Sequence, residues 1–333
     1  MKKILLATTA LAFSAGFAAA EVSFSGQAKM GLKYDGGNEK ETTVHSEAVL
    51  YVAMSGETDT GLAFGATIDM IVEDNGDLAN DDTTVFVSGA FGKLSMGAVP
   101  EADENGGLSS IGWDDFGGDL ATDDVAENIS GDELGEYLDF GDYIEDSDVS
   151  FSLSHNVNYT YAADAFSVSV SARIGDENVD SAAIGGRYNF GDAYVGLGYA
   201  RHSVNINDAL PGDIDFDVDA KVVTAVAGGT FGAFGIAAMY SDGKVEADGV
   251  AGEANIDAYG VRASYNMDAL TLTAAYSESD VSEIGFGIGD QKSYGLGAAY
   301  DLGGGALLAG GIGRAEEGDD KETVADFGIT MSF

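Results

Sequence analysis

The sequence of 333 residues contains no cysteine and only two prolines, Pro100 and Pro211. Without cysteine no disulfide can hold the fold, so backbone hydrogen bonds and packing must do so. Proline removes a hydrogen-bond donor from a strand, so its scarcity favours a chain rich in β-sheet. Glycine, by contrast, occurs 48 times, which suits tight turns and closely packed strands.

Basic residues are scarce as well. The chain has 15 Lys and Arg against 57 Asp and Glu, and its formal net charge is −42. Such a negative surface repels the phosphate backbone, which excludes nucleic acid as a partner. A large net charge can also indicate disorder, but the aromatic content of 10% and the regular patterning described below argue against it.

Long apolar runs are missing beyond the N-terminus. After residue 20 no run approaches the roughly 18 residues that a transmembrane helix needs. Residues 1–20 combine Lys2 and Lys3 with an apolar stretch from Ile4 to Phe17 and the small residues Ala18 to Ala20. This arrangement predicts a secretory signal peptide, cleaved near Ala20. We therefore expect one mature domain, residues 21–333, that works outside the cytoplasm.

Apolar side chains recur at every second position along the chain. From Val22 to Tyr34 the even positions are mostly apolar and the odd positions mostly polar. The same alternation runs through residues 62–70, 166–173, 259–267 and 325–333. Successive side chains of a strand point to opposite faces, so each segment predicts a strand with one apolar and one polar face. No segment shows a comparable helical period, and the chain is predicted to be all-β.

Short and long connections alternate between these strands. Seven are short: residues 55–61, 89–92, 162–165, 190–193, 231–234, 266–269 and 301–306. Eight are longer, polar and acidic: residues 35–43, 73–82, 99–148, 175–180, 202–219, 242–256, 278–291 and 315–322. This rhythm predicts a 16-stranded antiparallel transmembrane β-barrel with short periplasmic turns and long external loops. A soluble β-sandwich is the alternative, and it would not require an even strand count or one connection length at each end.

Three segments resemble a known family: Glu21–Gly26, Val85–Lys93 and Tyr294–Gly305. They are similar to segments of the alphaproteobacterial porins, typified by those of purple photosynthetic bacteria. The resemblance implies a general diffusion porin of the bacterial outer membrane, a water-filled channel for small hydrophilic solutes and ions. It further implies a homotrimer surrounded by membrane lipid and lipopolysaccharide, and a third external loop folded into each barrel. No cofactor is required, although the resemblance implies Ca²⁺ ions bound among loop carboxylates.

The third long segment is strongly acidic. Residues 101–148 carry 17 Asp and Glu and no Lys, Arg or His, and a loop of that length is usually functional or disordered. Inside a barrel it would form a negative constriction. Trp113 and Phe116 are candidates to anchor the loop. The acidic constriction residues that we single out are Asp114, Asp115, Asp119, Asp123, Asp124 and Glu127.

Several basic residues lie on the polar face of the predicted strands. These candidates for a pore-lining basic wall opposite the acidic loop are Lys29, Lys33, Lys93, Arg173, Arg187 and Arg262. A charged lumen sets ion selectivity. The family pattern has an arginine where this chain has Val49, so the balance is shifted toward carboxylates. We therefore expect a preference for cations.

Two other classes of function compete with that of a general porin. A substrate-selective channel on the same fold is the first alternative, and an enzyme or adhesin barrel is the second. Asp114-Asp115 is a candidate acid–base pair, but such pairs arise by chance in so acidic a chain, and no Gly-x-Ser-x-Gly motif occurs. His45, His155 and His202 are far apart in the sequence and lack metal-site spacing. We expect no enzymatic activity.

Overall fold

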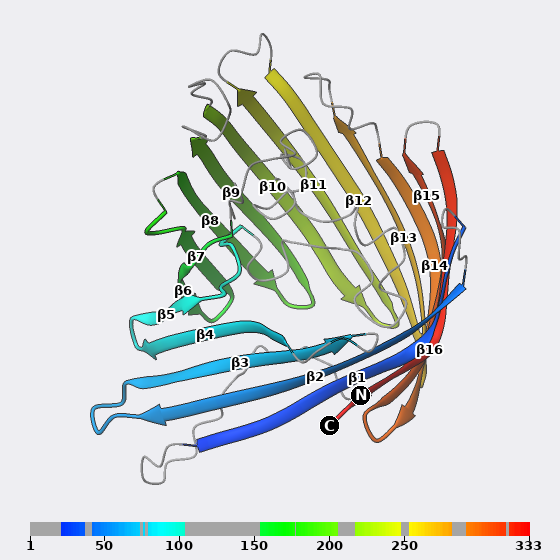
Figure 1. Cartoon of the computed structure of the whole chain (residues 1–333), viewed down its shortest axis with the longest axis horizontal. Coiled ribbons are helices and arrows are strands. Elements are labelled where there is room, and N and C mark those ends of the chain that lie inside the picture. Colours follow the sequence, from blue (N-terminus) through cyan, green and yellow to red (C-terminus); the bar gives the residue numbers. More distant parts are fainter. Residues whose placement is uncertain are drawn as a thin grey trace.

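The computed structural model describes residues 21–36, 42–73, 76, 79–103, 154–176, 178–205, 217–247, 253–281, 291–317 and 320–333. Sixteen strands of this part form one closed antiparallel barrel (Figure 1). The predicted fold class is therefore confirmed. The strands are β1 (Glu21–Asp35), β2 (Thr42–Glu57), β3 (Ala63–Glu73), β4 (Ala79–Gly89), β5 (Gly92–Gly97), β6 (Val157–Ala163), β7 (Phe166–Ala172), β8 (Val179–Phe190), β9 (Ala193–Asn205), β10 (Asp217–Phe231), β11 (Phe234–Ala247), β12 (Glu253–Met267), β13 (Leu270–Val281), β14 (Gln291–Gly303), β15 (Ala306–Glu317) and β16 (Asp320–Ser332).

The barrel closes between its first and last strands. Each strand pairs with its sequence neighbours, and β1 pairs antiparallel with β16, with Leu32 opposite Phe327. The terminal residue joins the seam, since the Phe333 N–H donates to the Gly26 carbonyl at 2.9 Å. Closure leaves no edge strand with unpaired backbone groups, which a sheet immersed in lipid requires.

All seven short connections are where the sequence predicts them. Six of them leave only two residues between strands, and in five of these the first of the two has a positive φ: Asp164, Gly191, Gly232, Asp268 and Gly304. Glycine adopts this conformation without strain, and Asp tolerates it better than most residues. The sequence of each hairpin therefore selects a tight reversal at this end of the barrel.

Six of the eight long connections at the opposite end are shorter than predicted, three of them markedly. β11 continues to Ala247 and β12 starts at Glu253, inside the predicted loop 242–256, and only two residues separate β15 from β16. The segment 202–219 likewise loses residues to β9 and β10. Outward polar side chains pair across strands there, as Lys321 Nζ does with Glu316 Oε2 at 2.7 Å. Polar composition thus marks strand ends in water rather than the end of the sheet.

The outer face carries the apolar phase of every strand. Phe24, Leu197, Leu296 and Phe327 are all more than half exposed, which fits contact with lipid rather than a protein core. Exposed aromatic side chains occur six residues apart on the same face of β11 and β14, at Phe234 and Tyr240 and at Tyr294 and Tyr300. Six residues span about 20 Å of strand. Two aromatic girdles therefore border an apolar band, as in transmembrane barrels.

No helix in the described part of the chain is long and apolar enough to cross a membrane.

Candidate functional site

The inner face of the barrel carries the polar phase, including most of the predicted basic residues. Lys29 and Lys33 lie on β1, Lys93 on β5, Arg187 on β8 and Arg262 on β12. All five occupy the phase opposite the exposed apolar side chains. Arg173 follows the end of β7, where its Nε lies 3.1 Å from Asp176 Oδ2 and its Nη1 donates to the Ser154 carbonyl at 2.9 Å. The six cations are spread around the ring rather than gathered on one side.

Several of these cations contact groups of the inner wall. Lys29 Nζ lies 3.3 Å from Glu47 Oε1. Lys93 Nζ stands 4.6 Å above the ring of Phe86, and the Arg187 guanidinium stands 3.7 Å above that of Tyr194. These cation–π contacts hold two long side chains against the wall and leave their charge facing the lumen. The charges of Lys29, Lys93 and Arg187 are therefore held at defined places on the inner wall.

The third loop turns into the barrel at its first residues. Asn158 Nδ2 donates to the Pro100 carbonyl at 2.8 Å, and the Ala102 N–H donates to Ser171 Oγ at 2.7 Å. Ala102 is completely buried against Ala183 and Ala200. These contacts place residues 100–103, which we call the loop root, flat on the inner face of β6–β9. The inward course of the loop is thus established where it begins.

Two glycines make room for the loop root. A Cβ on Gly185 would overlap the carbonyl oxygen of Ala102 and lie 3.0 Å from Asp103 Cα, and a Cβ on Gly198 would lie 2.5 Å from Asp103 Cβ. Real Cβ atoms are not found at these distances from other atoms. Gly185 and Gly198 therefore form a recess in the wall of β8 and β9 that only a residue without a side chain can provide.

The predicted acidic constriction and its anchor lie outside the described residues. Those residues are Asp114, Asp115, Asp119, Asp123, Asp124, Glu127, Trp113 and Phe116, and their roles stay predictions, as does the signal peptide of residues 1–20. The calcium prediction has the same status. Among the described residues one group of three metal-ligating side chains comes together, Glu101, His155 and His202, and its two imidazoles do not suit Ca²⁺, which prefers oxygen.

Sequence reasoning missed this group, because the two histidines are 47 positions apart and no local spacing marks them. The fold brings their rings to a centroid distance of 5.9 Å. Both are buried, as is Glu101 from the loop root. The histidines are far apart in the sequence as stated, but His155 and His202 are neighbours in the fold, while His45 lies apart on β2.

An apolar sector of the inner wall was also missed. On β10 the inward residues Val218, Ala220, Val222 and Val226 are 1–3% exposed. Their outward neighbour Val223 is 47% exposed, so both faces of this strand are apolar. The inner wall is consequently asymmetric, because this sector does not face open water. The sequence does signal this sector, because apolar and polar residues do not alternate in residues 222–227.

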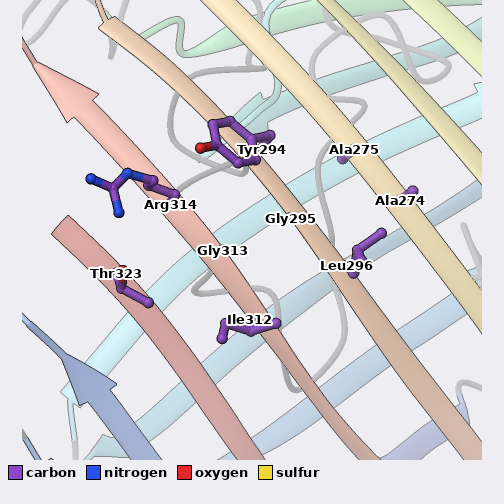
Figure 2. A pocket seen from close by; sticks show the side chains of 9 residues that line it. All are labelled: Ala274, Ala275, Tyr294, Gly295, Leu296, Ile312, Gly313, Arg314 and Thr323. Atoms are coloured by element: carbon purple, nitrogen blue, oxygen red, sulfur yellow. The ribbon is translucent and has the colours of Figure 1, made fainter. Parts of the chain in front are cut away.

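The outer face of β13–β15 carries a shallow groove (Figure 2). Ala274, Leu296 and Ile312 line its apolar part, while Tyr294 and Arg314 lie together toward one end. Arg314 Nε is 3.4 Å from Glu316 Oε1, and the arginine side chain is 40% exposed. The groove therefore combines apolar walls with a cation at the level of the external aromatic girdle.

Comparison with known proteins identifies the family. A family described as Gram-negative porin matches residues 7–320. The chain belongs to this family. A porin from Rhodobacter capsulatus is 33% identical to our porin over 330 residues, which is 94% of this chain and 100% of that one. The predicted resemblance is thereby confirmed, and with it a position in the bacterial outer membrane and the function of a general diffusion porin.

Solved structures agree with the fold. A porin structure refined at 1.8 Å resolution superposes with a TM-score of 0.68 and 28% identity, covering 94% of our porin and 100% of the other chain. The trimer form of OmpT from Vibrio cholerae gives a TM-score of 0.71 at 19% identity, covering 95% and 100%. The second likeness concerns the fold alone, since its sequence identity is low.

Proposed function

We propose that this porin is a passive, cation-preferring channel that assembles as a homotrimer and has no enzymatic activity. The observation that carries the proposal is the balance of charge in the lumen. Inward carboxylates of the described wall, Glu47, Asp69 and Asp326, stand among the inward cations. Residues 104–153 then add 15 acidic residues and no Lys or Arg. Because the loop root lies on the inner wall, we propose that this surplus acts on the pore.

Selectivity follows from this surplus. A lumen with fixed negative charge concentrates cations and repels anions, and the effect is long-ranged only when salt does not screen it. The wall residues Lys29, Lys33, Lys93, Arg187 and Arg262 are spread around the ring and offset only part of this negative charge. The constriction proper is assigned to Asp114, Asp115, Asp119, Asp123, Asp124 and Glu127.

Solute flux into vesicles tests the passive mechanism. Proteoliposomes that contain the mature protein should swell in iso-osmotic sugars at rates that fall with solute size and rise linearly with concentration. A selective channel, the first alternative, would instead saturate with one solute. For an enzymatic barrel, Asp114→Asn together with Asp115→Asn should abolish turnover of its substrate. In a porin the same change reduces cation preference only.

The trimer is supported by family membership and by a related fold whose structure is a trimer form. We expect the purified porin to migrate as a trimer on gels before heating and as a monomer afterwards. Chemical cross-linking in membranes should stop at three subunits. A monomer in both assays would contradict this part of the proposal.

The groove of Figure 2 supports contact with lipopolysaccharide. Leu296 and Ile312 offer apolar walls for an acyl chain, and Arg314 can bind a lipid phosphate at the membrane surface. We expect added lipopolysaccharide to raise the unfolding temperature of the wild type more than that of Arg314→Gln. The control is Arg201→Gln. Arg201 is an outward residue of β9, its Nη2 lies 3.3 Å from Asp180 Oδ2 on β8, and it does not line the groove. Equal shifts for all three proteins would refute the assignment.

A further inference from the structure

The buried group at the loop root has the composition of a transition-metal site. Glu101 contributes a carboxylate, and His155 and His202 contribute one imidazole each. Their ligand atoms all lie within 4.8 Å of one another. We propose that Glu101, His155 and His202 bind one divalent transition-metal ion, of which Zn²⁺ is the best match. The inference stands apart from solute transport, because it concerns neither the lumen charge nor the constriction.

The orientation of the two rings supports the proposal. His155 Nδ1 lies 2.6 Å from Ser171 Oγ, and His202 Nδ1 lies 2.6 Å from Ser181 Oγ. Each ring is thus held by a serine at its Nδ1 atom, and both Nε2 atoms face Glu101. A hydrogen bond to the ring nitrogen that does not bind metal is the usual way in which proteins orient histidine ligands.

The distances are close to those that a metal ion requires. His155 Nε2 is 3.7 Å from Glu101 Oε1, and His202 Nε2 is 3.9 Å from Glu101 Oε2. Tetrahedral Zn²⁺ with ligands at about 2.1 Å separates them by about 3.4 Å. The three ligand atoms lie within 4.8 Å of one another, so they must approach by at most about 1.4 Å. Two histidines and one glutamate also leave a fourth position for water, a ligand set known for Zn²⁺.

One buried donor has no partner without such an ion. His202 Nε2 is inaccessible to solvent and makes no hydrogen bond within the described residues, and the His202 side chain is 1% exposed. A buried polar atom without a hydrogen bond is costly and calls for an explanation. A metal ion at Nε2 supplies the missing partner.

The protons of the site balance when the ion binds. The Ala102 N–H donates to Ser171 Oγ, and that hydroxyl can donate to His155 Nδ1 when the ring carries its proton on Nε2. On metal binding each neutral imidazole moves its proton from Nε2 to Nδ1, where the serine oxygen accepts it. The contact of 2.5 Å between His155 Nε2 and Ser181 Oγ is exchanged for the metal bond. No proton is lost to solvent.

The position of the ligands indicates what the ion does. Glu101 lies in the loop root, His155 lies two residues before β6 at the other end of the third loop, and His202 lies on β9 of the wall. One ion therefore joins both ends of the third loop to the barrel. Because the bond bridges residues 54 positions apart, we expect it to stabilise the folded porin against unfolding.

Metal content tests the proposal directly. The wild-type protein should be refolded in detergent with Zn²⁺, desalted and measured by mass spectrometry, beside His155→Ala, His202→Ala and Glu101→Gln. The matched control is His45→Ala, since His45 is also buried on the inner face but lies on β2. With 57 acidic residues in the chain, weak binding elsewhere is expected, and the difference between variants decides.

The wild type and His45→Ala should retain one ion per chain and unfold at a higher temperature with Zn²⁺ than with a chelator. The three site variants should lose this ion and the thermal shift. Co²⁺ should give the visible absorption of a tetrahedral site in the wild type and in His45→Ala but not in the site variants, and Glu101→Gln provides this test if a histidine variant fails to fold. No stoichiometric ion in the refolded wild type, or equal retention by folded Glu101→Gln, would overturn the proposal.

Discussion

Replacement of Gly185 by alanine tests whether the loop root is held by a recess in the wall. The added Cβ would overlap the Ala102 carbonyl oxygen and lie 2.8 Å from the carbonyl carbon, both of them backbone atoms that cannot rotate away. The loop root must then move off the wall, which strains the 2.7 Å hydrogen bond from the Ala102 N–H to Ser171 Oγ. Overpacking of this kind costs about 1–3 kcal/mol.

The neighbouring glycine provides the control. A Cβ on Gly186, on the outer face of the same strand, would lie 3.5 Å from the Ser167 carbonyl oxygen and 3.7 Å from Val168 Cγ2, which are ordinary contacts. Neither glycine has a positive φ, so alanine strains the backbone at neither position. Alanine within a strand is favoured over glycine by about 0.5–1 kcal/mol, so Gly186→Ala should be neutral or slightly stabilising.

Urea unfolding of the porin in lipid vesicles, followed by the gel mobility of folded and unfolded forms, measures the difference. We expect Gly185→Ala to unfold at a clearly lower urea concentration than the wild type, and Gly186→Ala at the same or a higher one. Open-channel current noise should also increase in Gly185→Ala alone. If both variants unfold at the same urea concentration as the wild type, the loop root does not occupy the recess.

Three further predictions concern the lumen, the loop and the lipid face. Val49→Arg, on the inner face of β2, should lower the cation-to-anion permeability ratio, whereas neutral Val49→Gln should leave this ratio unchanged. Reversal potentials at low salt measure the ratio. An unchanged ratio in Val49→Arg would show that wall charge does not control selectivity. Trp113, the single tryptophan, should fluoresce at short wavelength and resist quenching by acrylamide if it anchors the loop; emission typical of water would reject the anchor. Ile236→Arg, on the lipid face of β11 between the two girdles, should reduce the folding free energy in bilayers by up to about 2–4 kcal/mol, the cost of an arginine at mid-membrane. Ile236→Leu should leave the folding free energy unchanged, and an Ile236→Arg variant as stable as the wild type would contradict contact of this face with lipid.

Much of the fold could be predicted because a transmembrane strand shows its environment at every second residue. The alternation from Val22 to Tyr34 gives both the strand and its outward face, and the seven short connections show where the chain reverses. Loop lengths were predicted less well, because polar residues such as Glu316 and Lys321 also suit strands that extend into water. Composition cannot distinguish a solvated strand end from a loop.

The candidate site was only partly predictable for a different reason. The alternation of apolar and polar residues alone places Lys29 or Arg262 on the inner face. In a closed membrane barrel the apolar side chains point outward to lipid, so the polar side chains point inward. Contacts between distant segments leave no local signal, and the meeting of Glu101 with His155 and His202 depends on the path of the loop root over Gly185 and Gly198. The inward valines of β10 were missed because their strand lacks alternation.

Planar-bilayer recording of single channels under a salt gradient tests the central claim most directly. The account predicts stepwise conductance in multiples of three and a reversal potential that favours cations, with the preference declining as salt is raised from about 0.01 M to 1 M and the screening length falls from about 30 Å to 3 Å. Anion preference would contradict the proposed charge balance of the lumen. Absence of conductance from protein that is folded and inserted would contradict the channel itself.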